Sequence, residues 1–225
     1  MLLDKNAHVI LNVFNIVHYF EQLDELKKML SEIELERCKR FVFDRDRNTY
    51  IIAHGLLREK LGRQIGQDAK NVNIAIGDNG KPMLESGDVF FNLSHSNQWV
   101  AMAFSYDSEL GVDVESTSPV RNWQEIVPNY FSDAEKWYID NCSEAQQYIA
   151  FLKCWTRKEA VLKAKGTGLT EQLKKIETRL EYDECEIQFL SDQGYVTMHV
   201  KTSCTRQYVC SVALPNPFKL QIFTK

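Results

Sequence analysis

Residues 110–115 have the sequence LGVDVE, which predicts a β-strand with two unlike faces. Because strand side chains alternate, Asp113 and Glu115 lie on one face, and Val112 and Val114 lie on the other, which we expect to face the core. Two carboxylates this close repel each other unless a cation lies between them, and Mg²⁺ prefers such hard oxygen ligands. The strand therefore indicates either a metal site or an exposed face with two solvated acids.

On both sides of this strand, predicted helices precede predicted strands, and WVAMAF (99–104) resembles YVCSVAL (208–214). This order favours an α+β fold with two similar halves, residues 1–107 and 108–225. Capping-box patterns and apolar spacing predict helices that start near Ser31, Asp46, Ser132 and Ser143, the last running to about Lys165 and stopped by Gly166 and Gly168. The other expected strands are 8–14, 72–76, 89–91, 185–190, 194–202 and 206–213, with a glycine-rich turn at 77–80.

The composition is that of an ordinary globular protein. The chain has 225 residues, of which 44% are hydrophobic and 26% charged, and its net charge of −4 gives no general basic surface for nucleic acid or an acidic membrane. No apolar run approaches the ~18 residues of a membrane span, and Met1–Lys5 does not begin a secretory signal. The six cysteines form no C-x-x-C pair, so we expect reduced thiols and a cytoplasmic location.

A second motif lies in the predicted helix at 155–163, with the sequence WTRKEAVLK. Glu159 and Lys163 are four residues apart, so they share one helix face, as an ordinary surface pair would. If Glu159 were a third carboxylate of the metal site, Lys163 would lie one turn further on, where it could meet a phosphate bound to that metal.

Three further segments carry polar or basic groups suited to phosphate. FNLSHS (91–96) holds Ser94 and His95 in a tight connection, although adjacent Ser and His do not define a catalytic triad. Gly80-Lys81-Pro82 lacks the P-loop pattern and is otherwise a solvated turn. RCKRF (37–41), with later arginines such as Arg47, is either a solvent-exposed helix face or a local anion-binding site.

In this order, the segments RCKRF (37–41), GKP (80–82), FNLSHS (91–96), GVDVE (111–115) and WTRKEAVLKAKGTGL (155–169) resemble the Sfp-type 4′-phosphopantetheinyl transferases. The resemblance spans roughly residues 31–170. It implies two pseudo-twofold-related α+β halves with coenzyme A in the cleft between them. It also implies Mg²⁺-dependent transfer of the phosphopantetheine arm of coenzyme A to a serine of an apo carrier protein, with release of 3′,5′-adenosine bisphosphate.

The resemblance also assigns residues. Asp113, Glu115 and Glu159 match the Mg²⁺-binding acids, and Lys163 matches the lysine at the pyrophosphate. The residues that match nucleotide-phosphate contacts are Lys81, Ser94, His95 and Arg37. Where the family often has another lysine, this chain has Glu34, and Arg47 is the candidate to compensate. Glu159 is the candidate base, directly or through water, and with Lys163 forms the predicted catalytic pair.

Two other classes of function remain open at this point. A metal-dependent nuclease also uses Asp, Glu and Lys around Mg²⁺, but the net charge of −4 disfavours it. A protein that binds coenzyme A or a carrier without transfer is the other alternative. We expect a monomer, because internal duplication removes one reason to oligomerise, and an acidic helical carrier docked at 116–131. The identity of the carrier stays open among fatty-acid, polyketide and peptide-synthetase types.

Overall fold

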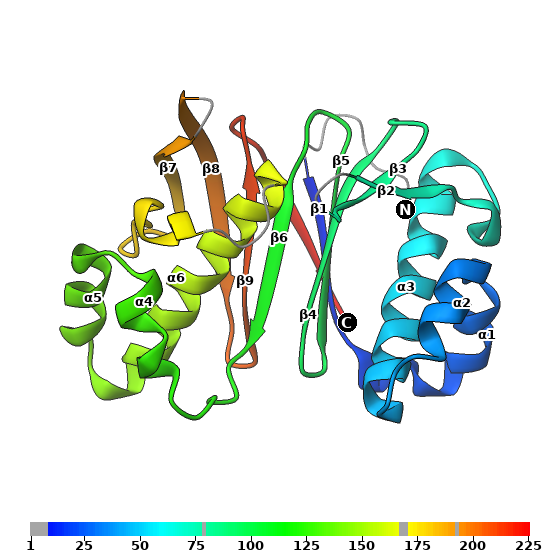
Figure 1. The fold of residues 1–225 in the computed structure, drawn as a ribbon, viewed down its shortest axis with the longest axis horizontal. Helices are drawn as coiled ribbons and strands as arrows, with labels where there is room; N and C mark the ends of the chain where they lie inside the picture. Colours follow the sequence, from blue (N-terminus) through cyan, green and yellow to red (C-terminus); the bar gives the residue numbers. More distant parts are fainter. Residues whose placement is uncertain (1–8, 78–79, 167–170, 192–193) are drawn as a thin grey trace.

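The computed structural model describes residues 9–77, 80–166, 171–191 and 194–225, and its strands form two four-stranded sheets and one hairpin (Figure 1). The first sheet has the order β10-β1-β5-β4, in which only β1 and β10 are parallel. Its strands are β1 (Val9–Asn15), β4 (Phe90–Ser96), β5 (Trp99–Ser105) and β10 (Leu220–Thr224). The last described strand of the chain therefore returns to the first sheet.

The second sheet is antiparallel, with the order β6-β9-β8-β7. It is made of β6 (Gly111–Ser116), β7 (Glu184–Ser191), β8 (Gly194–Cys204) and β9 (Tyr208–Leu214). The small hairpin joins β2 (Ile74–Ile76) to β3 (Pro82–Leu84). Helices and sheets together give an α+β fold, which confirms the predicted class.

Each large sheet carries helices on its outer side (Figure 1). On the first sheet these are α1 (Leu23–Lys28), α2 (Glu32–Cys38) and the long α3 (Asp44–Ile65). On the second they are α4 (Val127–Tyr130), α5 (Asp133–Asp140) and the long α6 (Glu144–Lys165). The layers are thus helix, sheet, sheet, helix.

Alternation along β1 shows how the layers are held together. Val9, Leu11 and Val13 pack against the second sheet, in a core shared with Val112 and Val114 of β6. Ile10 and Phe14 point the other way, into the core beneath α3. Because both faces of β1 pack against a core, its sequence is apolar on both faces and does not alternate. Burial of both faces stabilises the sheet-on-sheet contact.

The capping patterns gave mixed results. The boxes at Ser31/Glu34 and Ser132/Glu135 both form, which confirms the predicted starts of α2 and α5. The helix expected from Asp46 begins at Asp44 instead. Ser143 is the residue before α6 as predicted, but its hydroxyl donates to the side chain of Gln146 and caps no backbone group, so the third box was wrong.

The remaining sequence predictions are placed as follows. The structure adds α1, α4, β3 and β10, which the sequence analysis did not predict. Gly166 ends α6 in the left-handed conformation, as expected, with φ of 72°. Some predictions fall on positions outside the described residues. These positions are Met1–Lys5, residue 8 of the first predicted strand, residues 78–79 of the predicted turn, and Gly168. All six cysteines are free thiols, and no helix in the described part combines the length and apolar character needed to cross a bilayer.

Candidate functional site

The site is built where α6 lies directly against β6, and Gly111 makes that contact possible. A Cβ at Gly111 would lie 2.0 Å from the carbonyl oxygen of Ala160 and 2.3 Å from the amide nitrogen of Ala164. Both distances are far inside van der Waals contact, so only glycine fits at this point of the strand. Ala160 and Ala164 are themselves small and buried. The close approach brings the side chains of α6 to the polar face of β6.

Asp113 and Glu115 project to that polar face, while Val112 and Val114 are fully buried on the other, as the alternation predicted. Lys163 donates from Nζ to Asp113 Oδ1 at 2.6 Å and to Ser94 Oγ at 3.0 Å. Ser94 in turn donates to the same carboxylate oxygen at 2.7 Å. Residues from β4, β6 and α6, separated by up to 69 positions in the sequence, therefore meet at one carboxylate.

Two carboxylate oxygens at this point have no hydrogen-bond partner although they are buried. They are Asp113 Oδ2 and Glu159 Oε1, two of the three such side-chain atoms among the described residues. An unpaired buried carboxylate oxygen is costly, and a divalent cation is a natural partner for it. The oxygens therefore fit a hard metal ion.

The carboxylates affect one another electrostatically. Burial and the charge of Asp113 raise the pKa of Glu159, and the same two causes raise the pKa of Glu115 to about 7. A hydrogen bond from Ser96 opposes the rise at Glu115. These shifts show that the three acids share one electrostatic environment and that bringing them together costs free energy when no cation is bound.

The described residues contain no group of three Asp, Glu, His or Cys side chains already arranged to hold a metal. The ammonium of Lys163 binds Oδ1 of Asp113 instead. In this arrangement Lys163 supplies the positive charge that the carboxylates need. A cation that used Asp113 together with Glu115 and Glu159 would have to displace or share this lysine contact.

Strand β4 is joined to β6 by side chains rather than by a backbone ladder. Asn92 accepts from the backbone N–H of Val112 at 2.9 Å, Ser94 binds Asp113, and Ser96 donates to Glu115 and accepts from the N–H of Ser116. Asn92 and Ser96 were not predicted as site residues. The polar alternation Asn-x-Ser-x-Ser at 92–96 was the signal that could have identified them, because every second residue of a strand lies on one face.

His95 points away from this row and is exposed. The protein around it and the positive charge of Lys163 nevertheless lower its pKa, with a smaller contribution from His54. The lowered pKa favours the neutral imidazole at His95. A neutral ring can still donate one hydrogen bond to a phosphate oxygen.

The basic residues of α2 and α3 lie on the His95 side of the site. Arg37 lies over the ring of Tyr50, with its guanidinium carbon 5.3 Å from the ring centroid, and Tyr50 stacks on His54 at 3.9 Å. Arg47 binds Asp44 at 2.6 Å. The charges of His54 and Asp46 both act on His95, which places this end of α3 near it.

Glu34, which stands where the resemblance favoured a lysine, has a structural role. Its carboxylate closes the capping box of α2 and binds the buried Arg58, while His54 approaches it at 3.2 Å. Burial alone would raise the pKa of Glu34, but hydrogen bonds from His54 and the Ser31 backbone and the charge of Arg58 lower it to about 2. At neutral pH Glu34 is therefore ionised, and its carboxylate is bound by Ser31, His54 and Arg58.

Lys81 lies beside the site and does not reach its carboxylates. Its ammonium binds Glu109 and donates to the carbonyl oxygen of Leu110 at 2.9 Å, directly before β6. It lines a cavity of about 270 Å³ together with Ala164 and Gly166 at the end of α6. Glu109, which the sequence did not single out, thus holds Lys81 next to the last turn of the site helix.

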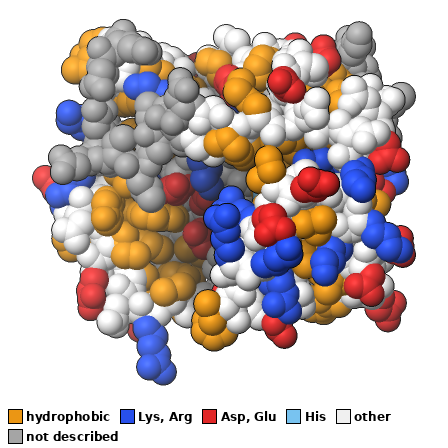
Figure 2. All heavy atoms as spheres, turned by 45° about the vertical axis from the view of Figure 1, so that its right-hand side comes forward, with side chains coloured by type: hydrophobic (Ala, Val, Ile, Leu, Met, Phe, Trp, Pro, Cys, Tyr) orange, Lys and Arg blue, Asp and Glu red, His pale blue; other side chains and the backbone are white. Residues whose placement is uncertain are grey.

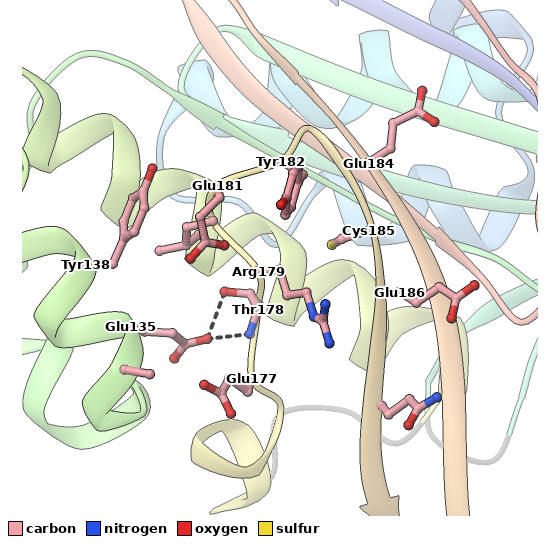
Figure 3. A pocket seen from close by; sticks show the side chains of 13 residues that line it. Glu135, Tyr138, Glu177, Thr178, Arg179, Glu181, Tyr182, Glu184, Cys185 and Glu186 are labelled. Atoms are coloured by element: carbon pink, nitrogen blue, oxygen red, sulfur yellow. Dashed lines mark hydrogen bonds between the residues drawn. The ribbon is translucent and has the colours of Figure 1, made fainter.

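A cavity of about 560 Å³ lies elsewhere and contains none of the predicted site residues. It lies beside α5 and β7, and Figure 3 shows its many carboxylates. Several of these are already paired: Glu135 accepts from Thr178, Glu184 binds Lys201, and Glu186 approaches His199. We therefore regard it as a structural groove. The space-filling view shows a different hollow, with basic side chains gathered along one side and acidic ones in its depth (Figure 2).

Comparison with known proteins gives the class. Residues 109–213 match the 4′-phosphopantetheinyl transferase superfamily, and residues 19–107 match the N-terminal region of 4′-phosphopantetheinyl transferases. The chain therefore belongs to the 4′-phosphopantetheinyl transferase family and is an enzyme of that class.

Two transferases of known sequence agree with this. The transferase HetI of Nostoc sp. is 34% identical over 71% of this chain and 68% of its own length. The transferase Sfp of Bacillus subtilis is 30% identical over 90% of this chain and 85% of its own length. A solved holo-(acyl-carrier-protein) synthase of Bacillus anthracis, in complex with CoA (3′,5′-ADP), is 15% identical, with a TM-score of 0.36 over 47% of this chain and 92% of that one.

Proposed function

We propose that the chain transfers the 4′-phosphopantetheine arm of coenzyme A to a serine of an apo carrier protein, in a Mg²⁺-dependent reaction that releases 3′,5′-adenosine bisphosphate. The observation that carries this proposal is the pair of buried, unpartnered oxygens on Asp113 and Glu159 next to the ammonium of Lys163. This combination offers oxygen ligands to a cation and a positive charge to a phosphate within one small volume.

Asp113, Glu115 and Glu159 are the proposed ligands of the Mg²⁺. When bound, the ion would neutralise charge on the pyrophosphate and polarise the phosphorus that is attacked. Ser96 holds Glu115 and Ser94 holds Asp113, so β4 orients two of the three carboxylates. The same hydroxyls stabilise the ionised form of each acid.

The proposed transfer forms one bond and breaks one. The serine oxygen of the carrier bonds to the phosphorus next to pantetheine, and the bond from this phosphorus to the bridging oxygen breaks, leaving that oxygen on 3′,5′-adenosine bisphosphate. Glu159 accepts the serine proton, directly or through a water, and the route through a water is favoured because a Mg²⁺ ion bound to this carboxylate would lower its pKa and make it a poor base. Lys163 leaves Asp113 and stabilises the departing phosphate.

Nucleotide-phosphate contacts are proposed for Lys81, Ser94, His95, Arg37 and Arg47. Of these residues, Ser94 accepts a hydrogen bond from Lys163, and the positive charge of Lys163 acts on His95. Arg37 and Arg47 approach from α2 and α3, and each must give up or share its present partner, Tyr50 or Asp44.

The partner is proposed to be an acidic, helical acyl or peptidyl carrier. The segment 116–131 offers exposed Val120 and Tyr130, whereas Phe131 is fully buried in the core of the second half. Only the exposed part of this segment is available for docking. The free thiols support the further proposal of a cytoplasmic enzyme, and the shared core of the two sheets supports a monomer.

The test is mass spectrometry of apo carriers incubated with coenzyme A and Mg²⁺. We expect a mass gain of one phosphopantetheine arm on a single carrier serine, lost when that serine is replaced by alanine. A panel of fatty-acid, polyketide and peptide-synthetase carriers identifies the substrate. If coenzyme A binds and no carrier in the panel gains mass, the proposed transfer is wrong and the chain is a binding protein. Cleavage of DNA or RNA in the same buffer would instead support a nuclease.

A further inference from the structure

A second cavity, of about 270 Å³, lies between the C-terminal part of α3 and the β1–β10 edge of the first sheet. In Figure 1, α3 runs alongside this sheet, whose order places β10 and β1 at one edge and β4 at the other. The candidate transferase site uses β4 and the second sheet. This cavity is therefore separate from that site.

One side of the cavity is apolar. Ile10 and Phe14 of β1, Phe104 of β5 and Phe223 of β10 contribute to its lining. The first three belong to the core beneath α3, and Phe223 packs against that core from the edge strand. Such a wall favours an apolar group of a ligand, because water next to it gains little by hydrogen bonding.

The other side carries three cations, Lys60, Arg63 and Lys225. Lys60 donates to the amide oxygen of Asn12 at 2.8 Å and forms no ion pair with an acid of the described residues. Arg63 binds Glu59, but its side chain is 68% exposed, and Lys225 lies 4.9 Å from the centroid of the Tyr19 ring. The side-chain carboxylate of Glu59 pairs with one of these three cations, Arg63.

The charges around Lys60 affect its pKa. Burial lowers the pKa of Lys60, Glu59 opposes this shift, and the positive charges of Arg63 and Lys225 add smaller lowering contributions. A half-buried ammonium among like charges is unfavourable, and an anion placed beside it would relieve this cost. The cavity therefore offers positive charge at one side and apolar contact at the other.

We propose that this cavity binds a small amphipathic carboxylate. Its carboxylate would lie between Lys60, Arg63 and Lys225, and its apolar tail would lie against Phe14 and Phe223. A charge-assisted hydrogen bond from Lys60 or Arg63 orients the head group. Inorganic phosphate would satisfy the cations and leave the apolar wall exposed, so we expect the tail to add affinity.

The test is a titration of the ¹⁵N-labelled full chain with octanoate, followed by backbone amide shifts. Octanoate should shift amides of β1, β10 and the end of α3, and should bind at least tenfold more tightly than acetate, phosphate or 1-octanol. These three probes separate the contributions of tail and charge. Equal binding of phosphate and octanoate would reduce the site to a plain anion site and overturn the proposal.

Three variants sharpen the result. Lys60→Met keeps the stem and removes the charge, so octanoate affinity should fall at least tenfold, while Lys174→Met, an exposed lysine outside the cavity, should leave it unchanged. Arg63→Gln, at an exposed position, provides the same test if Lys60→Met does not fold. Phe223→Ala should weaken octanoate and leave acetate unaffected. Unchanged octanoate binding in Arg63→Gln and Phe223→Ala would show that the cavity is not the site.

Discussion

Lys163 Nζ lies 2.6 Å from Asp113 Oδ1, while Asp113 Oδ2 is buried without a partner. The two oxygens of one carboxylate thus have opposite situations, one neutralised by an ammonium and one free for a cation. A site that must hold both a metal and a phosphate needs such a division, because the lysine can move to the phosphate when the metal takes over the carboxylate.

Replacement of Asp113 by asparagine should abolish transfer without unfolding the protein. The amide keeps the shape and the bond from Ser94 but removes the charge that a cation and Lys163 require, so the rate should fall by at least ~100-fold. Carrier modification followed by mass spectrometry measures this at saturating Mg²⁺. The exposed Asp140, replaced by asparagine, is the matched control and should keep full activity. Full activity in the Asp113 variant would exclude the proposed role.

Removal of the lysine charge should uncover a metal site in the absence of substrate. In Lys163→Gln, nothing cationic competes for Asp113 Oδ1, so Mg²⁺ should bind about tenfold more tightly, a change of ~1.4 kcal/mol, although transfer is lost. Isothermal titration with Mg²⁺ alone measures the affinity. Lys174→Gln serves as the control at an exposed position. Weaker Mg²⁺ binding in Lys163→Gln would contradict the displacement of Lys163 by the metal.

A methyl group at Gly111 should damage both the fold and the site. The Cβ of Gly111→Ala would collide with the backbone of α6 at Ala160 and Ala164, which cannot move as a side-chain tip can. We expect a loss of about 3 kcal/mol or more in the free energy of unfolding, measured by urea denaturation. In Gly77→Ala the nearest atom is 3.4 Å away, so its stability should change little. Equal stability of the two variants would refute the steric role of Gly111.

Low pH should remove the contribution of Glu34 to the free energy of unfolding. Its pKa is lowered to about 2 in the folded protein from an ordinary 4.5, so the ionised form stabilises the fold above pH 4.5. That contribution, about 3 kcal/mol, is lost as the pH falls from 4.5 towards 2. Glu34→Gln should therefore be less stable than the wild type at pH 7, with the difference shrinking below pH 4.5. Urea unfolding at several pH values measures it, and Glu36→Gln, at an exposed position, should show no such trend.

The sequence by itself determined the local facts. The alternation in GVDVE separated two acids from two valines, the capping boxes at Ser31 and Ser132 set two helix starts, and glycine at 166 ended α6, because each depends on geometry within a few residues. The resemblance in the motifs indicated the family, which the comparisons confirm.

Only the tertiary structure decided which groups meet. Four side-chain contacts join residues that are 19 to 28 positions apart, and no local spacing encodes them. They are the hydrogen bonds of Ser94 to Asp113 and of Ser96 to Glu115, and the ion pairs of Lys81 with Glu109 and of Arg58 with Glu34. The return of β10 to β1 joins residues even further apart. The physical reason is that packing of distant elements selects these contacts, as where Gly111 lets the backbone of α6 lie directly against β6.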